Sequence, residues 1–178
     1  MSTKVADHHT AIHEAGHTVA HIRLGLEHDG ANIIRVDGRL GAAKGEGKGH
    51  VWDKGGAESV VLAFCSGYAA MVAVGCTEFE ALAGTEDDFE QAGELIAEWV
   101  LPGDIEAWQA RAVDLMCRHE NMAAVALIAE HLLQRKRLDG DYCDVLVEVS
   151  DGAATKADLA RYLALREHIE QDLESKRA

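Results

Sequence analysis

Near its start the chain contains a His-Glu-x-x-His motif, formed by His13, Glu14 and His17. Four residues make about one helical turn and ~6 Å of rise, so a helix here presents both imidazoles on one face. Two neutral imidazoles at that separation can bind one tetrahedral Zn²⁺ at about 2.0–2.1 Å each. Glu14 lies one step round from His13, where it can reach a metal-bound water without being a ligand. The spacing predicts zinc-water chemistry with Glu14 as the general base.

The residues around this motif have the pattern of a long helix. Val5, Ile12, Val19 and Leu24 recur on one apolar stripe, which predicts a helix from about residue 3 to residue 26 that a glycine ends. A glycine inside a helix costs about 1 kcal/mol relative to alanine. Gly16 therefore marks a place where another backbone or a ligand comes close.

Length and composition favour a single, mainly helical domain over residues 1–178. An apolar share of 48% with only 5% aromatic residues leaves Ala, Leu and Val to build the core, and these favour helices. The formal charge of −14, with acidic residues spread along the chain, argues against nucleic acid and anionic membranes as partners. Without a signal peptide or a C-x-x-C pair, the four cysteines are expected to be reduced thiols of a cytoplasmic protein.

One uncharged run, Val60–Cys76, approaches the lower length limit for a membrane span. It contains Ser66, Gly67 and Gly75 and has no basic flank, so we expect a buried core helix and no membrane span.

The remaining patterns predict further helices and a small hairpin or sheet, hence a mainly α (α+β) fold. Thr85 and Asn121 are expected to cap two of the helices, and Thr155 with Asp158 forms a capping box for the last one. The expected elements are a strand at 31–36 with a turn at 37–38, a mobile glycine-rich loop at 41–49, a strand at 50–52, helices at 57–74, 85–100, 103–118, 121–138 and 155–176, and a helix or strand at 142–149.

A catalytic zinc needs a third protein ligand and an open position for water. The third histidine of a metzincin is excluded, because Ala20 and Arg23 stand where that motif needs Gly and His. A carboxylate from a later helix is the alternative, and the acidic helix start at 85–92 offers the best one. The formally available glutamates are Glu78, Glu80, Glu86 and Glu90.

Here the chain resembles the zinc peptidase module of FtsH-type ATP-dependent proteases, family M41. The His-Glu-Ala-Gly-His of 13–17 is that family's motif, and Asp87-Asp88-Phe89-Glu90-Gln91-Ala92 matches its Asn-Asp-x-x-x-Ala. The segments 66–70 and 126–140 also resemble family motifs, so the likeness covers about residues 8–149 and leaves 155–176 as an extra C-terminal helix. It implies a zincin-like helical peptidase domain with Zn²⁺ on His13, His17 and Asp88.

The resemblance has two departures. Tyr68 and Met71 replace the family's Arg and Glu, and no P-loop, ATPase domain or membrane anchor is present. The expected function is therefore hydrolysis of peptides or unfolded proteins, without a motor of its own. The strand at 31–36 is expected to hold the substrate by edge pairing. A homo-oligomer and a separate ATPase or unfoldase partner stay open.

Two alternatives compete with the peptidase hypothesis. One is a catalytically inactive or regulatory binding module on a peptidase-like scaffold, against which the intact Glu14 argues. The other is a structural zinc domain, which a fourth protein ligand would close. His21, one turn beyond His17, is expected to support the site or face solvent. His8, His9 and His28 are expected on or beside the first helix. The histidines expected to be surface residues and not ligands are His50, His119, His131 and His168.

Overall fold

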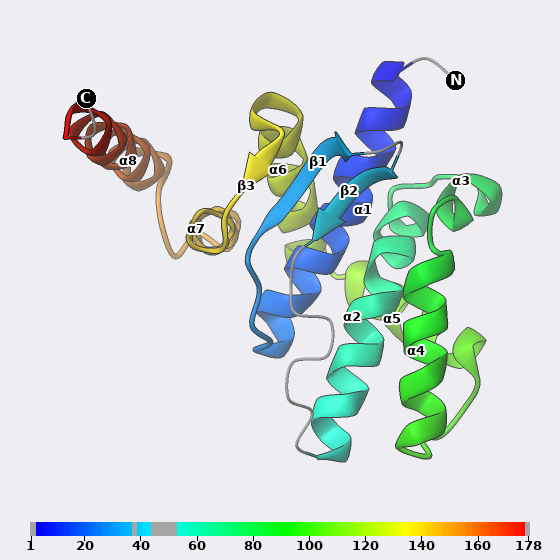
Figure 1. Cartoon of the computed structure of the whole chain (residues 1–178). Helices are drawn as coiled ribbons and strands as arrows, with labels where there is room; N and C mark the ends of the chain where they lie inside the picture. Colours follow the sequence, from blue (N-terminus) through cyan, green and yellow to red (C-terminus); the bar gives the residue numbers. More distant parts are fainter. Residues whose placement is uncertain (1–2, 37–38, 44–52, 177–178) are drawn as a thin grey trace.

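Two long helices that cross at a glycine form the centre of the fold. The computed structural model describes residues 3–36, 39–43 and 53–176, and the two helices are α1 (Thr3–Leu24) and α2 (Lys54–Ala73) (Figure 1). A Cβ atom at Gly16 would lie 2.5 Å from the carbonyl oxygen of Ser66 and 2.6 Å from the Cβ of Ala70. Glycine thus permits a backbone approach that any other residue would block. The close approach predicted at Gly16 is confirmed, with α2 as the partner.

The rest of the chain surrounds this pair with shorter helices and a small sheet, so the prediction of a mainly α fold is confirmed. Leu95, Trp108 and Met116 from the middle of the chain and Leu132 and Leu146 from its later part share one buried apolar cluster with α1 and α2. The other elements are β1 (Ala31–Val36), β2 (Arg39–Ala43), α3 (Glu78–Leu82), α4 (Glu86–Glu98), α5 (Ile105–Met116), α6 (His119–Arg135), β3 (Arg137–Leu138), α7 (Gly140–Ser150) and α8 (Lys156–Ser175).

The sheet has three antiparallel strands in the order β2-β1-β3. β1 begins and ends as predicted, and it pairs with β2 on one side, whereas Ala31 and Asn32 pair with β3 on the other. The predicted loop at 41–49 is wrong in its first part, because residues 41–43 complete β2. The predicted turn at 37–38, the rest of that loop and the strand at 50–52 lie outside the described residues.

The two residues predicted as helix caps make other hydrogen bonds. Thr85 occupies the N-cap position of α4, as predicted, but its hydroxyl donates to the carbonyl of Leu82 at 2.9 Å and makes no cap hydrogen bond. Asn121 lies inside the first turn of α6, where its buried amide donates to Leu115 and accepts from Arg23, both at 2.8 Å. These contacts connect α6 to α5 and α1. The side-chain amide of Asn121 is therefore used in helix packing and not as a helix cap.

Other local predictions are confirmed or extended. The hydroxyl and backbone N–H of Thr155 bond to the carboxylate of Asp158 at 2.6 and 2.9 Å, which is the predicted capping box of α8. The ambiguous segment at 142–149 is helical, as part of α7. The short helix α3 was not predicted, although Thr77 and Glu80 form a capping box at its start. The helix predicted to end at residue 138 ends at Arg135, after which Lys136 turns the chain into β3 with φ 66°.

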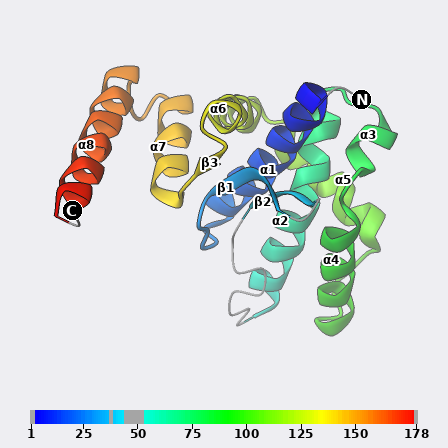
Figure 2. The same cartoon turned by 45° about the horizontal axis from the view of Figure 1, so that its top comes forward.

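The uncharged run belongs to α2, which packs against α1, α4 and α5 as the predicted core helix. Among the described residues, α2 is the one helix long and apolar enough to cross a membrane by length and composition, and half of its most apolar window is buried. At the other end of the chain, α8 lies at the edge of the molecule beside α7 (Figures 1 and 2). It is held there by the tilted rings of Tyr142 and Tyr162, whose centroids are 5.8 Å apart, and by an ion pair between Arg166 and Asp139.

Candidate metal centre

The three predicted ligands come together from two distant parts of the chain. His13 and His17 lie one turn apart on α1, and Asp88 comes from the first turn of α4. The two histidine Nε2 atoms are 3.0 Å apart, and Asp88 Oδ2 lies 3.2 Å from each of them. Tetrahedral zinc with bonds of 2.0–2.1 Å needs ligand atoms about 3.3 Å apart. The triangle therefore has the dimensions of one face of a zinc tetrahedron.

A backbone carbonyl sets the tautomer of one ligand. Nδ1 of His17 lies 2.8 Å from the carbonyl oxygen of Ala63 on α2. A carbonyl only accepts hydrogen bonds, so Nδ1 carries a proton and donates it. In the neutral imidazole, Nε2 is then unprotonated and directs its lone pair at the triangle, as a metal ligand requires. Ala63 was not predicted, because a backbone contact from another helix leaves no mark on the sequence.

A second glycine makes room for the imidazoles. A Cβ atom at Gly67 would lie 2.6 Å from Cε1 and 2.7 Å from Nε2 of His13, and closer still to Nε2 of His17. Real Cβ atoms essentially never approach other heavy atoms within 3.0 Å. Gly67 therefore forms the backbone wall behind the donor triangle. The sequence offered one signal for it, a glycine retained inside a helix at a cost of about 1 kcal/mol.

Glu14, the predicted base, is buried beside the triangle. Only 6% of its surface is exposed, and its charge helps to raise the pKa of His17. The hydroxyl of Thr18 donates to the carbonyl of Glu14 at 2.8 Å within the same helix. Glu14 is thus near the imidazoles and outside the set of donor atoms, as a base that is no ligand must be.

Burial and charge act in opposite directions on the triangle. Burial lowers the pKa of both histidines; it prevails at His13, whereas at His17 the hydrogen bond and the charge of Asp88 outweigh it and raise the pKa to about 9. Burial alone would raise the pKa of Asp88, but its contacts with the two histidines hold it well below the ordinary range. The contact with Asp88 thus favours a proton on His17, and a metal ion that binds there would have to displace it.

The donor set has three members and stays open to solvent. His13 and Asp88 keep 14% and 22% of their side chains exposed, which leaves a path for water to a fourth position. Among the described residues, no fourth His, Cys, Asp or Glu completes the cluster. Cys65 is near enough for the charge of Asp88 to reach it, but burial, aided by that charge, raises the pKa of its thiol to about 12. A protonated thiol is neither a ligand nor a nucleophile.

The other candidate residues lie elsewhere or make other contacts. The carboxylate of Glu80 accepts from Thr77 at the start of α3, and Glu86 is exposed in the same turn as Asp88. His21 lies 2.9 Å from the carbonyl of Glu27 through its Nδ1. His28 pairs with Asp144, and His131, which was expected at the surface, is partly buried against Tyr142. The structure places His8, His119 and His168 at the surface and His9 half-buried, whereas His50 lies outside the described residues.

Tyr68 and Met71 make aromatic and apolar contacts. The ring of Tyr68 meets that of Phe89 edge to face, with centroids 5.7 Å apart. Tyr68 follows Gly67 and Phe89 follows Asp88, so this contact joins α2 to α4 beside the triangle. Met71 is buried in the core.

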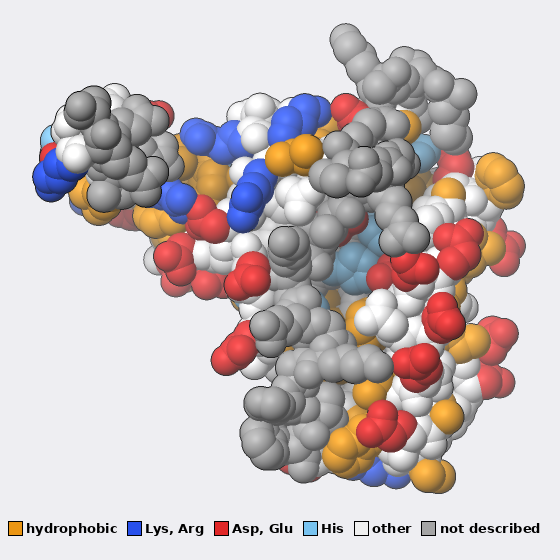
Figure 3. Space-filling view, viewed as in Figure 1, with side chains coloured by type: hydrophobic (Ala, Val, Ile, Leu, Met, Phe, Trp, Pro, Cys, Tyr) orange, Lys and Arg blue, Asp and Glu red, His pale blue; other side chains and the backbone are white. Residues whose placement is uncertain are grey.

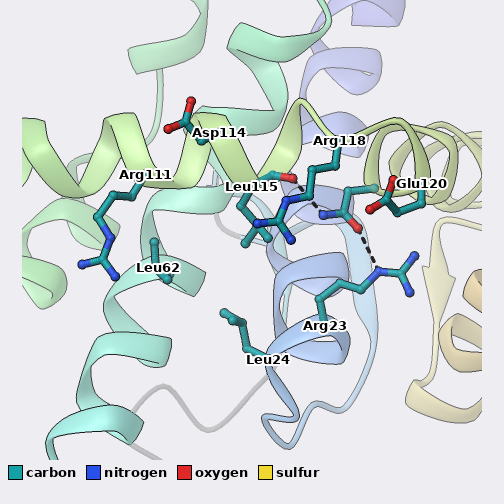
Figure 4. A pocket seen from close by; sticks show the side chains of 9 residues that line it. Arg23, Leu24, Leu62, Arg111, Asp114, Leu115, Arg118 and Glu120 are labelled. Atoms are coloured by element: carbon teal, nitrogen blue, oxygen red, sulfur yellow. Dashed lines mark hydrogen bonds between the residues drawn. The ribbon is translucent and has the colours of Figure 1, made fainter.

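A separate hollow of about 470 Å³ is lined by residues of α1, α2, α5 and α6 (Figure 4). Leu24, Leu62 and Leu115 provide its apolar lining, and Arg23 bonds there to Asn121. Its charged side chains are of both signs, and none of the predicted site residues lines it. The donors that could hold a metal are therefore confined to the triangle among the described residues.

Comparisons of the chain with protein-family models and with curated proteins find no match.

Proposed function

We propose that this protein is a zinc metallopeptidase that hydrolyses peptide bonds in peptides or unfolded proteins. One observation carries the proposal: the triangle of His13, His17 and Asp88 has zinc dimensions, and its third corner comes from a helix 71 positions further along the chain. Glu14 beside the triangle supplies a base. The resemblance to FtsH-type (M41) zinc peptidases adds support, because it matches the same four positions.

Zinc held by the three ligands would supply Lewis-acid activation of water and of a peptide carbonyl. The chain's own groups do the rest. Glu14 takes a proton from the attacking water and returns it to the nitrogen of the leaving amine. Ala63 keeps the His17 ring in the tautomer that leaves Nε2 free to bind. Gly67 keeps the space of the triangle clear.

In the described part of the chain, the sheet offers an extended peptide two open edges. β1 pairs with β2 on one side, and Ala31 and Asn32 pair with β3 on the other, so the predicted edge pairing is excluded at the start of β1 and stays a prediction for the rest of the strand. Among the described residues, β2 is the outer strand on its side of the sheet, and it contacts α1, which carries both histidines. We propose that an extended substrate pairs with the outer edge of β2. Such pairing requires an unfolded backbone, so a folded substrate would need a separate unfoldase.

The test combines metal content with casein hydrolysis in wild type and Glu14→Gln. The variant keeps all three ligands and loses the base, so we expect wild-type zinc content and no hydrolysis. Glu27→Gln, at an exposed glutamate outside the triangle, is the matched control and should keep both. Full hydrolysis by Glu14→Gln would reject the mechanism. Zinc without hydrolysis in the wild type would favour the regulatory module instead.

A further inference from the structure

The basic residues of this chain are unevenly placed. Residues 55–110 contain eleven Asp or Glu and no Lys, Arg or His. This stretch includes α3 and α4, and α4 contributes Asp88 to the metal triangle. The acidic excess of the protein is thus concentrated next to its candidate active site.

The structure places α3 and α4 along one side of the histidines. α3 packs against α2, whose Gly67 backs the triangle. Glu80 on α3 has its pKa lowered by the hydrogen bonds of Thr77 and, to a smaller extent, by the charge of His9 on α1. Asp88, in the first turn of α4, lies 3.2 Å from His13, so the start of α4 is beside the histidines as well. Figure 3 shows acidic side chains gathered over α3 and α4 beside the histidines. We call the exposed acids Glu78, Glu86, Asp87 and Glu90 the acidic wall.

The centre itself does not cancel this charge. Zinc with two neutral imidazoles and the carboxylates of Asp88 and Glu14 is close to neutral overall. The fixed charge on this side of the centre is therefore that of the acidic wall, and α3 and α4 contain no Lys, Arg or His to offset it. Clefts lined by one sign of charge raise the local concentration and association rate of oppositely charged ligands.

An exposed aromatic residue stands within the same acidic stretch. Phe79, between Glu78 and Glu80 on α3, has 82% of its surface exposed, and Leu82 in the same helix is also exposed. Isolated apolar residues are common on surfaces, but an aromatic side chain flanked by acids fits a polypeptide with apolar and basic residues side by side.

We propose that the acidic wall makes cationic polypeptide segments the preferred substrates of the metal centre. This inference rests on the proposed peptidase function. The wall lies beside the metal triangle and holds no ligand by itself. Segments rich in Lys and Arg are attracted to it, and segments rich in Asp and Glu are repelled.

The test uses a peptide that spans a cut identified from the casein cleavage products, synthesised in three versions with Lys, Gln or Glu at the same two positions flanking the cut. We expect kcat/KM to fall about tenfold from the Lys to the Glu version at 10 mM salt. The difference should shrink towards onefold at 1 M salt, where the Debye length is about 3 Å.

A triple variant, Glu78→Gln with Glu86→Gln and Glu90→Gln, should bring the Lys-to-Glu ratio towards one, with zinc content measured alongside. The control carries the same charge change at exposed glutamates of α6, α7 and α8, as Glu130→Gln with Glu148→Gln and Glu167→Gln, and should keep the ratio. Equal cleavage of the three peptides by the wild type at low salt would overturn the charge preference and leave the peptidase function standing. Cleavage of none of them, nor of casein, would overturn the peptidase function itself.

Discussion

Replacing Gly67 by alanine tests whether the donor triangle is a metal site or a chance meeting of polar groups. The new Cβ would lie 2.6–2.7 Å from two atoms of the His13 ring, and ordinary contact needs at least 3.4 Å. The ring must therefore move by about 0.7 Å or more. Metal–ligand distances tolerate only about 0.2 Å, so the shift exceeds the tolerance several-fold. We expect Gly67→Ala to bind zinc at least 100-fold more weakly than the wild type.

The same substitution should affect the metal-free protein differently. Alanine favours a helix over glycine by about 1 kcal/mol, which partly offsets the cost of moving the buried rings. Gly93→Ala is the matched control, because it lies inside α4 with nothing within 4 Å of the new Cβ. It should gain helix stability and keep zinc binding.

The assay is thermal unfolding of each protein with and without zinc, together with zinc titration. Zinc should raise the midpoint of the wild type and of Gly93→Ala, because binding to the folded state alone stabilises it. It should leave the midpoint of Gly67→Ala almost unchanged. Zinc binding of wild-type strength in a folded Gly67→Ala would refute the reasoning, since the triangle could not then be where the metal binds.

Three further outcomes are expected. Asp88→Ala should lose most bound zinc, whereas Asp87→Ala and Glu86→Ala, in the same turn but outside the triangle, should retain it; an empty site in Glu86→Ala would move the ligand by two positions. Without metal, the pKa of His17 is about 9 in the folded protein and near 6.5 in the unfolded chain. Protonation of His17 therefore stabilises the folded state, fully so below pH 6.5, and this stabilisation is lost as the pH rises through 9. Zinc must displace that proton, so its apparent affinity should rise about tenfold per pH unit from pH 7 to pH 9, and a flat profile would contradict a protonated His17. ATP should not affect casein cleavage, because the sequence has no phosphate-binding loop. A stable folded domain should resist cleavage, because its unfolding costs about 5–15 kcal/mol. ATP-stimulated degradation of that domain by this chain alone would refute both expectations.

Local patterns in the sequence were enough for the parts of the fold that depend on neighbouring residues. The spacing of His13 and His17 acts within one helical turn, and so does the capping box of Thr155 and Asp158. The apolar periodicity of α1 and the β-branched run of β1 predicted their limits within a few residues. Each depends on backbone geometry that repeats over two to four residues, so it can be predicted before the chain is folded.

Contacts between distant segments were decided by the tertiary structure. Asp88 was placed in the site by resemblance to a family, and folding brings its Oδ2 to 3.2 Å from both imidazoles. The carbonyl of Ala63 and the bare backbone of Gly67 carry no chemical signature of their own, yet they fix the tautomer and the space of the site. Asn121 has the side chain of a helix cap, but the packing of α6 against α1 and α5 gives it other partners. Residue type and spacing therefore determined which groups could bind a metal, whereas the packing of α1 and α4 against α2 decided which of them meet, because that depends on contacts between residues far apart in the chain.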